Sequence, residues 1–414
     1  MITPGYSPTA TERVLPRLAL DFTTASLDAR VTVARSLNTA TRVNSSGLIE
    51  AVNANLPRFD FDPITKVCKG LLIEESRTQT ARGTDIMSQW SKSAATGVAN
   101  VIVSPSGAQD ADLIYPSSSG NDRQVYTQST TVPTSGSVAI SVFAADAGLN
   151  WLIIYGFDSV TPLAWFDVAN GVKGTVVAGW TSEIEPYENG FYRCSVVGTA
   201  VAGGYITFGI ANADNSRAVT ASGTNGLYFW GAQVEAGAFK TSYIANTDFT
   251  NGSSVTRNAD AVSMTGTNFS DWYNATEGAL LVQATAEIPA TDANVRFAAA
   301  IYDTAAYANA FRLERLSGNC RAIKTVSGSS LVASYSWPID VTGKAIMSYK
   351  DSSSASSFRA ANPGLYAGGV PSGMAYLGIG GSHVGSNVWC GHVQRIQYWP
   401  QRLINAETQA FTKD

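Results

Sequence analysis

Histidine and cysteine are scarce in this chain of 414 residues, which has only His383, His392 and four widely separated cysteines. Two histidines leave almost nothing from which to build a catalytic triad or a multi-histidine metal site. The cysteines form no Cys-x-x-Cys pair, which argues against structural zinc and against a dense disulfide framework. We therefore interpret both imidazoles as ordinary, partly exposed side chains, and we expect no metal site and no cofactor.

Charge is also scarce, at 14% of the residues, where an average soluble protein carries about 25%. With 28 basic and 32 acidic side chains, the chain has no basic excess that could neutralise nucleic-acid phosphates. The longest apolar runs, such as 151–155, fall far short of the ~18 residues of a membrane-spanning helix. Residues 1–20 contain no uninterrupted hydrophobic segment of the kind found in signal peptides. We expect neither nucleic-acid binding nor membrane insertion.

What the chain has in quantity is short β-rich runs separated by turns of Gly, Ser, Asn and Asp. Residues 137–143, 205–210 and 392–399 are clear examples, and strands at this spacing are typical of sandwiches and jelly rolls. One short helix is predicted at residues 405–411, with Asn405 as its cap. The fold class is all-β: an N-terminal extended arm and hairpins (1–85), followed by two β-sandwich (jelly-roll) domains at 86–246 and 255–414.

The first 85 residues are too few to form an independent core. Prolines in residues 1–16 predict an extended arm, and residues 41–52 and 59–74 are predicted hairpins. Eight of the ten basic residues in this segment are arginine, which suits ordered interface contacts, although a solvated face explains the same composition. The hairpins must bury their apolar side chains against other chains or the next domain, so we predict a homo-oligomer, specifically a trimer. Those side chains are Phe59, Phe61, Leu71 and Ile73.

Three stretches of sequence resemble known proteins. Residues 18–79, with Leu18-Ala19-Leu20-Asp21-Phe22 and Gly70-Leu71-Leu72-Ile73-Glu74, resemble the N-terminal segment of tailed-bacteriophage fibre, spike and head-fibre structural proteins. The strings 189–194, 229–235 and 239–244 resemble carbohydrate-binding-module-like jelly rolls of the same phage proteins, and residues 256–403 resemble a laminin-G/concanavalin-like sandwich. The resemblance implies a virion component, often trimeric, that is attached to capsid or tail proteins by its N-terminal part.

Two aromatic residues with acidic neighbours have the composition of a sugar site, which needs an exposed flat ring beside carboxylates or amides. The candidates are Trp165 with Asp167, and Trp180 with Glu183 and Glu185. The alternative is that these rings fill the core of a sandwich. The pairs Glu183/Glu185 and Asp60/Asp62 have i, i+2 spacing, which places both acids on one face of a strand. Such a pair suits carboxylate catalysis or Ca²⁺, but no third partner can be assigned from the sequence.

Together these observations favour a non-enzymatic structural protein of a bacteriophage virion that displays glycan-binding sandwiches for adhesion to host surface polysaccharide. A tailspike-type enzyme that degrades this polysaccharide is the alternative, although a long repetitive β-helix and an acidic cleft are not visible in the sequence. A secreted bacterial carbohydrate-binding protein is a third possibility, which the absence of a visible signal peptide disfavours. The expected location is the virion, on capsid or tail.

Overall fold

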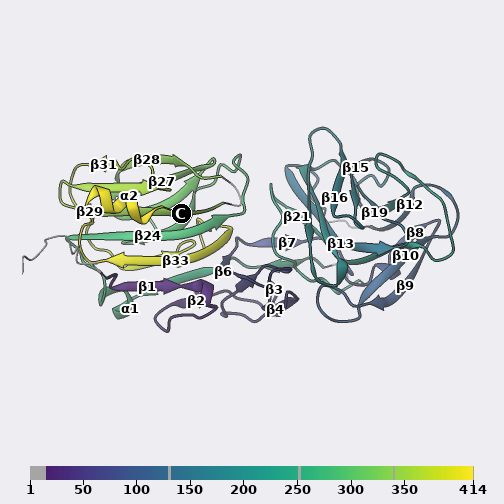
Figure 1. Cartoon of the computed structure of the whole chain (residues 1–414), viewed down its shortest axis with the longest axis horizontal. Helices are drawn as coiled ribbons and strands as arrows, with labels where there is room; N and C mark the ends of the chain where they lie inside the picture. Colours follow the sequence, from purple (N-terminus) through teal and green to yellow (C-terminus); the bar gives the residue numbers. More distant parts are fainter. Residues whose placement is uncertain (1–14, 129–131, 250–252, 339–340, 414) are drawn as a thin grey trace, which may run out of the picture.

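The computed structural model describes residues 15–128, 132–249, 253–338 and 341–413. The molecule consists of two lobes side by side along its long axis, and each lobe is a β-sandwich (Figure 1). Strands dominate the described chain, so the prediction of an all-β fold is confirmed. The middle of the chain forms one lobe, and the two ends of the chain together form the other.

The jelly-roll lobe contains two six-stranded antiparallel sheets. Its first sheet has the order β17 (Thr181–Pro186), β18 (Tyr192–Thr199), β13 (Ser137–Ala147), β21 (Gly226–Ala236), β10 (Ala111–Pro116) and β9 (Ala95–Ile102). Its second sheet has the order β16 (Val172–Val176), β15 (Pro162–Asp167), β14 (Trp151–Tyr155), β19 (Tyr205–Ala211), β12 (Arg123–Gln128) and β8 (Ser91–Ser93). A short ribbon of β11 (Gly120–Asn121) and β20 (Ala218–Val219) lies outside both sheets.

Strand β13 of the jelly-roll lobe is buried on both of its faces. Alternate residues of a strand point to opposite faces, and Val138, Ile140 and Val142 enter the core between the two sheets. Phe143 and Ala145 point the other way, yet they are also buried, in an apolar cluster with residues that lie outside the sheet. Both faces of β13 are therefore covered, and the second cover comes from the junction between the lobes.

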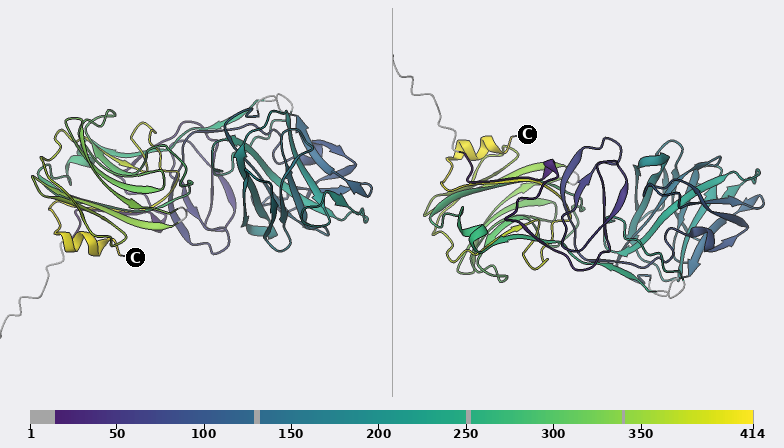
Figure 2. Two further views of the ribbon diagram at one scale, coloured as in Figure 1. Left: turned by 90° about the horizontal axis from the view of Figure 1, so that it is seen from above. Right: turned by 90° about the horizontal axis from the view of Figure 1, so that it is seen from below.

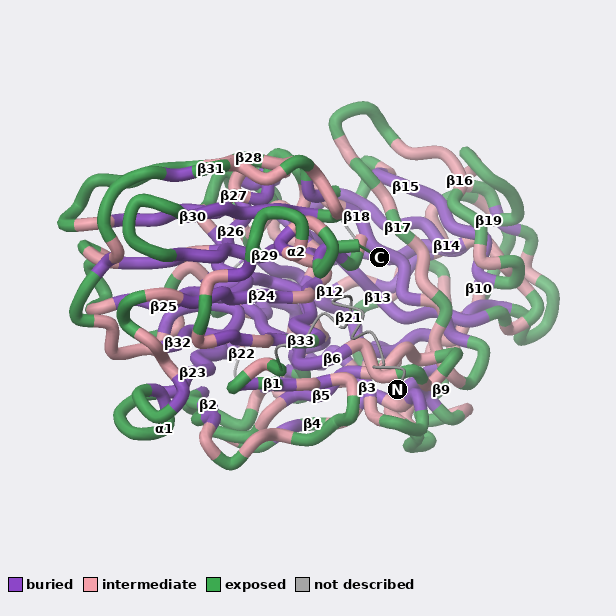
Figure 3. Tube along the Cα trace, turned by 60° about the vertical axis from the view of Figure 1, so that its left-hand side comes forward, coloured by how far each residue is buried: buried purple, intermediate pink, exposed green. Residues whose placement is uncertain are grey.

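The second lobe is a larger sandwich of an eight-stranded and a seven-stranded sheet. The eight-stranded sheet contains β31 (Gly364–Tyr366), β30 (Ser354–Phe358), β29 (Thr342–Lys350), β24 (Glu277–Ala286), β33 (Gly391–Trp399), β6 (Cys68–Ile73), β5 (Phe59–Phe61) and β1 (Leu18–Asp21). The seven-stranded sheet contains β2 (Thr32–Ala34), β23 (Ala261–Thr265), β32 (Tyr376–Ile379), β25 (Arg296–Tyr302), β26 (Ala310–Leu316), β27 (Asn319–Val326) and β28 (Ser329–Ser336). Buried strands fill the interior, and exposed loops cover the outside (Figure 3).

Strands from the N-terminal segment are built into this second lobe. One edge of β33 pairs with β1 along Arg395–Tyr398 and with β6 along Gly391–Val393, while β2 pairs with β23 in the opposite sheet. The described part of the N-terminal segment therefore differs from the separate unit that we predicted: its strands β1, β2, β5 and β6 belong to the sheets formed by β23 to β33, and the jelly roll is inserted between these two parts of the chain. The physical reason is that a short strand with one apolar face buries that face, and pairs its backbone groups, when it joins the edge of an existing sheet.

The apolar residues of the predicted hairpins are covered within this one chain. Phe59, Leu71 and Ile73 are buried, and Phe61 packs against the same core. Because these side chains are buried within one chain, they do not require contacts with other chains. The trimer stays a prediction, and residues 1–14 of the predicted arm lie outside the described residues.

Two short ribbons join the lobes. Strand β7 (Arg77–Gln79) leads into the jelly roll and pairs with β22 (Val255–Arg257), which leads out of it. The strands β3 (Ala40–Val43) and β4 (Ile49–Val52) form the hairpin that was predicted at residues 41–52, and this hairpin lies between the lobes (Figure 2). Val43 and Ile49 of this hairpin join the apolar cluster that covers the outer face of β13.

A buried ionic network surrounds these ribbons. The Glu74 carboxylate pairs with Arg58 and with Arg257 at 3.0 Å, and Asp260 pairs with Arg58 and with Arg35 at 2.7 Å. The three guanidinium side chains have no exposed surface. Burial opposes ionisation of Glu74, but Arg257 and Arg58 outweigh it and lower the pKa of Glu74 to about 2. The arginine-rich composition of the N-terminal segment thus serves an interface, and that interface is inside the chain.

Helices contribute little to the fold. The described chain includes α1 (Thr267–Ser270) and α2 (Asn405–Phe411), and the second confirms the predicted helix. Its cap differs from the prediction, because Ile404 is the N-cap and its backbone N–H donates to Glu407. Within the described ranges, every helix lacks the length and apolar character that crossing a membrane would require.

The buried network predicts an acid-sensitive junction. In Glu74→Gln, Arg58 and Arg257 lose a counter-charge, so we expect the free energy of unfolding at pH 7 to fall by about 3–5 kcal/mol. Because the pKa of Glu74 is lowered in the folded state, its stabilising effect is complete above about pH 4.5 and is lost as the pH falls toward 2. Urea denaturation of both proteins should show a difference that shrinks between pH 5 and pH 2.

The half-exposed pair Arg42–Glu50, 2.7 Å apart, supplies the control. Glu50→Gln should cost less than about 1 kcal/mol. A Glu74→Gln protein as stable as wild type at pH 7 would contradict the structural role of the network.

Strand β1 predicts where an N-terminal truncation becomes harmful. Removing residues 1–14 should leave the thermal unfolding midpoint unchanged. Removing residues 1–21 also deletes Leu18 and Leu20, which are 0% and 3% exposed, so the midpoint should fall by several degrees. Differential scanning calorimetry of the two truncations tests this, and equal midpoints would contradict the pairing of β1.

Candidate functional site

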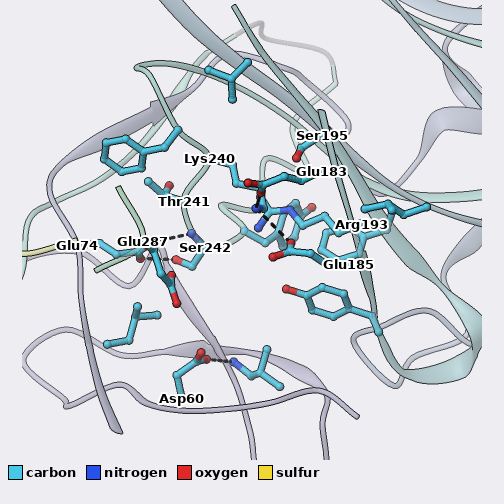
Figure 4. A pocket seen from close by; sticks show the side chains of 18 of the residues that line it. Asp60, Glu74, Glu183, Glu185, Arg193, Ser195, Lys240, Thr241, Ser242 and Glu287 are labelled. Atoms are coloured by element: carbon cyan, nitrogen blue, oxygen red, sulfur yellow. Dashed lines mark hydrogen bonds and ion pairs between the residues drawn. The ribbon is translucent and has the colours of Figure 1, made fainter. Parts of the chain in front are cut away.

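A cleft of about 510 Å³ lies at the junction of the two lobes (Figure 4). The jelly roll contributes β17, β18 and the loop 238–243 that follows β21. The other wall comes from the β3–β4 hairpin, from β5 and β6, and from residues just after β24. We call this space the inter-sandwich cleft. Five acidic and five basic side chains line it, so it is polar and nearly balanced in charge.

On the jelly-roll side, Lys240 lies between two carboxylates of one strand. Glu183 and Glu185 are two residues apart on β17, so their side chains lie on the same face of the strand. The Lys240 ammonium contacts Glu183 and lies 3.3 Å from Glu185. The Lys240 side chain is only 15% exposed. Its ammonium lowers the pKa of Glu183. The two carboxylates thus already share one cation.

On the opposite side, His392 lies between two carboxylates. Its Nε2 is 2.9 Å from Asp60 Oδ2, and its Nδ1 is 2.9 Å from Glu287 Oε1. Lys69 lies 3.0 Å from the same Glu287 oxygen. Burial and the Lys69 ammonium oppose protonation of His392, but Glu287 and Asp60 outweigh them, so the pKa of His392 is raised above its ordinary value. Burial likewise works against Glu287, yet Lys69 and His392 hold its pKa well below the ordinary value.

Hydroxyl and amide groups connect the cleft to the buried network. The backbone N–H of Ser242 donates to Glu74 at 2.7 Å, and its hydroxyl donates to the same carboxylate at 2.6 Å. Asp60 accepts from the backbone N–H of Val43 at 2.7 Å, which ties the hairpin to the base of the cleft. The loop that carries Lys240 and the hairpin are therefore both held in place by buried carboxylates.

Three carboxylates of the cleft have lowered pKa values. Nearby cations lower the pKa of Glu74, Glu183 and Glu287. A glycosidase of the two-carboxylate type needs one carboxyl group with a raised pKa that can donate a proton. The arrangement suits the binding of polar groups better than it suits acid–base chemistry.

Trp165 lies elsewhere, on the outer face of the second jelly-roll sheet. Its ring is 4% exposed among Ile153, Tyr155 and Ala211, and its indole N–H donates to the backbone of Ser216 at 2.7 Å. This burial corrects our expectation for Trp165, because a buried ring offers no face to a sugar.

Asp167 also has a local structural role. Its carboxylate accepts hydrogen bonds from the side chain of Asn150 at 3.0 Å and from the side chain and backbone of Asn170 at 2.8 and 3.2 Å. Burial opposes ionisation, but the Asn170 and Asn150 hydrogen bonds outweigh it and lower the pKa of Asp167. These bonds hold the turn after β15 and occupy both oxygens.

Trp180 is half-buried and packs against the jelly-roll core, outside the residues that line the cleft. Only Glu183 and Glu185 of the five predicted residues lie in the cleft. Trp180 is close to Gly198, where an added Cβ would collide with the indole. A small residue at position 198 therefore accommodates the ring.

The interpretation of both histidines as partly exposed is wrong for His392, which is 1% exposed, and holds for His383. Sequence reasoning also missed Lys69, Glu287 and Lys240. Lys69, Glu287 and His392 lie on three segments far apart in sequence, and no spacing pattern could have joined them. Lys240 belongs to the 239–244 string, which was used as a resemblance and not as a site.

Both acidic i, i+2 pairs have partners within the protein. Lys240 takes the position between Glu183 and Glu185, and Asp62 accepts from the backbone N–H groups of Ile64 and Thr65. Among the described residues, no group of three His, Cys, Asp or Glu side chains is arranged to hold a metal ion.

No protein-family profile and no curated protein sequence matches this chain. Among solved structures, the chain is similar to the CBM40 of the Ruminococcus gnavus IT-sialidase. The identity is 12% and the TM-score 0.29 for the structure bound to α2,3-sialyllactose, and 11% and 0.29 for the structure without it. Each match covers 34% of this chain and 84% of the other chain. It is also similar to domains LG4-5 of the mouse laminin α1 chain (9%, TM-score 0.23), over 70% of this chain and 88% of that one. At these values the similarities carry no conclusion about function.

The position of His392 predicts a stability that depends on pH. A histidine with a raised pKa stabilises the fold fully below about pH 6.5, and this contribution is lost as the pH rises through its folded-state pKa. His392→Gln should therefore be more destabilising at pH 6 than at pH 8.5, as measured by urea denaturation.

His383 is the matched control, because burial lowers the pKa of its imidazole. The cost of His383→Gln should not grow at pH 6. A His392→Gln cost that is the same at both pH values would contradict the assignment.

Proposed function

We propose that this chain is an adhesive structural protein of a bacteriophage virion, and that its inter-sandwich cleft binds a polysaccharide of the host surface without cleaving it. The observation that carries the glycan part is the cleft itself. It brings paired carboxylates, Lys240, and the hydroxyls of Thr241 and Ser242 into one concave site. Sugars present rims of hydroxyls, and such a mixture of donors and acceptors matches them.

The virion part of the proposal rests on the N-terminal strings that resemble phage fibre and spike proteins. In this proposal residues 1–14 attach the protein to capsid or tail proteins, since residues 18–21 are committed to strand β1. A homotrimer would multiply weak single-site contacts into lasting attachment. Labelling the protein on intact particles with an antibody would test this placement, and its absence from particles would overturn it.

The alternative of a polysaccharide-degrading enzyme is less well supported. The cations that lower the pKa of Glu74, Glu183 and Glu287 favour carboxylates over proton-donating carboxyl groups. An enzyme would release reducing ends from the polymer, whereas a binding site would not.

The cleft is tested by filling it. Thr181 is exposed on β17 and lines the cleft, so Thr181→Trp should obstruct it without disturbing the core. On a panel of bacterial capsular and O-antigen polysaccharides, we expect this variant to bind about tenfold more weakly than wild type, because several hydrogen bonds are lost. Biolayer interferometry measures binding, and a reducing-sugar assay runs in parallel.

Thr224→Trp is the control, because Thr224 is exposed and lies outside the cleft lining. This variant should bind like wild type. Equal binding by Thr181→Trp and wild type would overturn the cleft as the site, and release of reducing ends would favour the enzyme.

A further inference from the structure

Arg193 is a buried cation in the cleft that lacks an ionic partner. It lies on β18 and is only 4% exposed, yet no ion pair joins it to a carboxylate in the described parts of the chain. Its Nη2 donates to Ser141 Oγ at 3.1 Å, and its guanidinium lies over the Phe143 ring at 5.4 Å. Its Nε has no hydrogen-bond partner among the described residues. A buried cation without a direct ion pair is a candidate for binding a ligand of opposite charge.

The neighbouring carboxylates explain why Arg193 has no direct ion pair. Glu185 is its direct cross-strand partner in the β17–β18 pairing, and Glu183 is two residues away on the same face. Lys240 holds both carboxylates (Figure 4), so neither is within ion-pair distance of Arg193. Two cations, Lys240 and Arg193, thus lie beside each other on one wall.

Across the whole cleft, a second cation also lacks an ion pair. All five lining acids are in ion pairs: Asp60 with His392, Glu74 with Arg58 and Arg257, Glu287 with Lys69, and Glu183 and Glu185 with Lys240. Of the five lining cations, Lys173 and Arg193 have no such pair in the described chain. The lining charges balance at five to five, but these two cations make no direct ion pair and are therefore the ones that an anionic ligand would meet, although residues 86–250 contain only six basic residues against twelve acidic ones.

We propose that the inter-sandwich cleft takes an anionic saccharide, one that bears carboxylate or sulfate groups, and that Arg193 binds the anionic group. This inference rests on the proposed glycan-binding function and specifies its ligand class. The planar guanidinium matches the two oxygens of a carboxylate or sulfate. Ser141 and Phe143 hold it in place before the ligand arrives, which lowers the entropy lost on binding. Lys173 at the exposed rim adds long-range attraction.

The test compares charged and uncharged forms of one polymer. The probes are polygalacturonate, its fully methyl-esterified form, dextran sulfate and dextran, in affinity electrophoresis of the full chain. Wild type should be retarded by at least one anionic polymer and much less by its neutral counterpart, and retardation should weaken several-fold between 0.05 and 0.5 M salt, on the order expected from screening. Retardation by polygalacturonate identifies carboxylate as the group, and retardation by dextran sulfate alone identifies sulfate.

Arg193→Met should weaken binding of the anionic polymer about 10- to 100-fold, because hydrogen bonds between charged groups are lost. Arg193→Lys keeps the positive charge but loses the planar arrangement of donors, so its affinity should lie between those of wild type and Arg193→Met. It also provides the test if the methionine variant fails to fold. Lys350→Met, which removes an exposed cation of the other lobe, is the matched control and should bind like wild type.

The outcomes separate this inference from the proposed function. Equal binding of charged and neutral polymers, with Thr181→Trp still harmful, would overturn the anionic ligand and leave glycan binding intact. Full binding by both Arg193 variants would also overturn it. Binding that Thr181→Trp does not affect would overturn the cleft itself, and the absence of binding to either anionic polymer would count against the inference.

Discussion

The arrangement of this molecule depends on a small set of charges that are buried where the chain passes between its lobes. Arg35 and Arg58 come from the N-terminal segment, Arg257 and Asp260 follow the jelly roll, and Glu74 precedes it. Each of these groups would be costly to bury alone, so the segments that carry them must come together. Their ion pairs join the segments on either side of the jelly roll to the N-terminal segment, at the point where the chain passes from one lobe to the other.

The cleft is a consequence of the same constraint. Glu74 fixes the loop 238–243 through Ser242, and Asp60 fixes the β3–β4 hairpin through Val43, so both walls are attached to buried carboxylates. A binding site with walls of this kind is preorganised, because little conformational entropy remains to be lost when a ligand enters. The distribution of ion pairs then leaves Arg193 as a buried, unpaired cation in the described structure.

Insertion of one sandwich into another also decides what the N-terminal segment can do. Residues 18–73 supply strands to both sheets of the larger lobe, and so they are not available as a separate attachment domain. Any attachment role therefore falls to residues before Leu18 or to the outer surface of these strands. The same pairing covers one edge of β33, which would otherwise expose unpaired backbone groups.

The sequence by itself determined the local structure. Alternating apolar residues and turn composition predicted the all-β class, the hairpin around Asn44–Gly47, the helix at Asn405–Phe411 and the shared face of Glu183 and Glu185, because each depends on neighbours within a few residues. Pairing between distant segments was decided only in the tertiary structure. Three features depend on contacts between residues that lie 51 to 332 positions apart, which periodicity and composition do not encode. They are the burial of Trp165, the contacts of His392 with Asp60 and Glu287, and the pairing of the β17 carboxylates with Lys240.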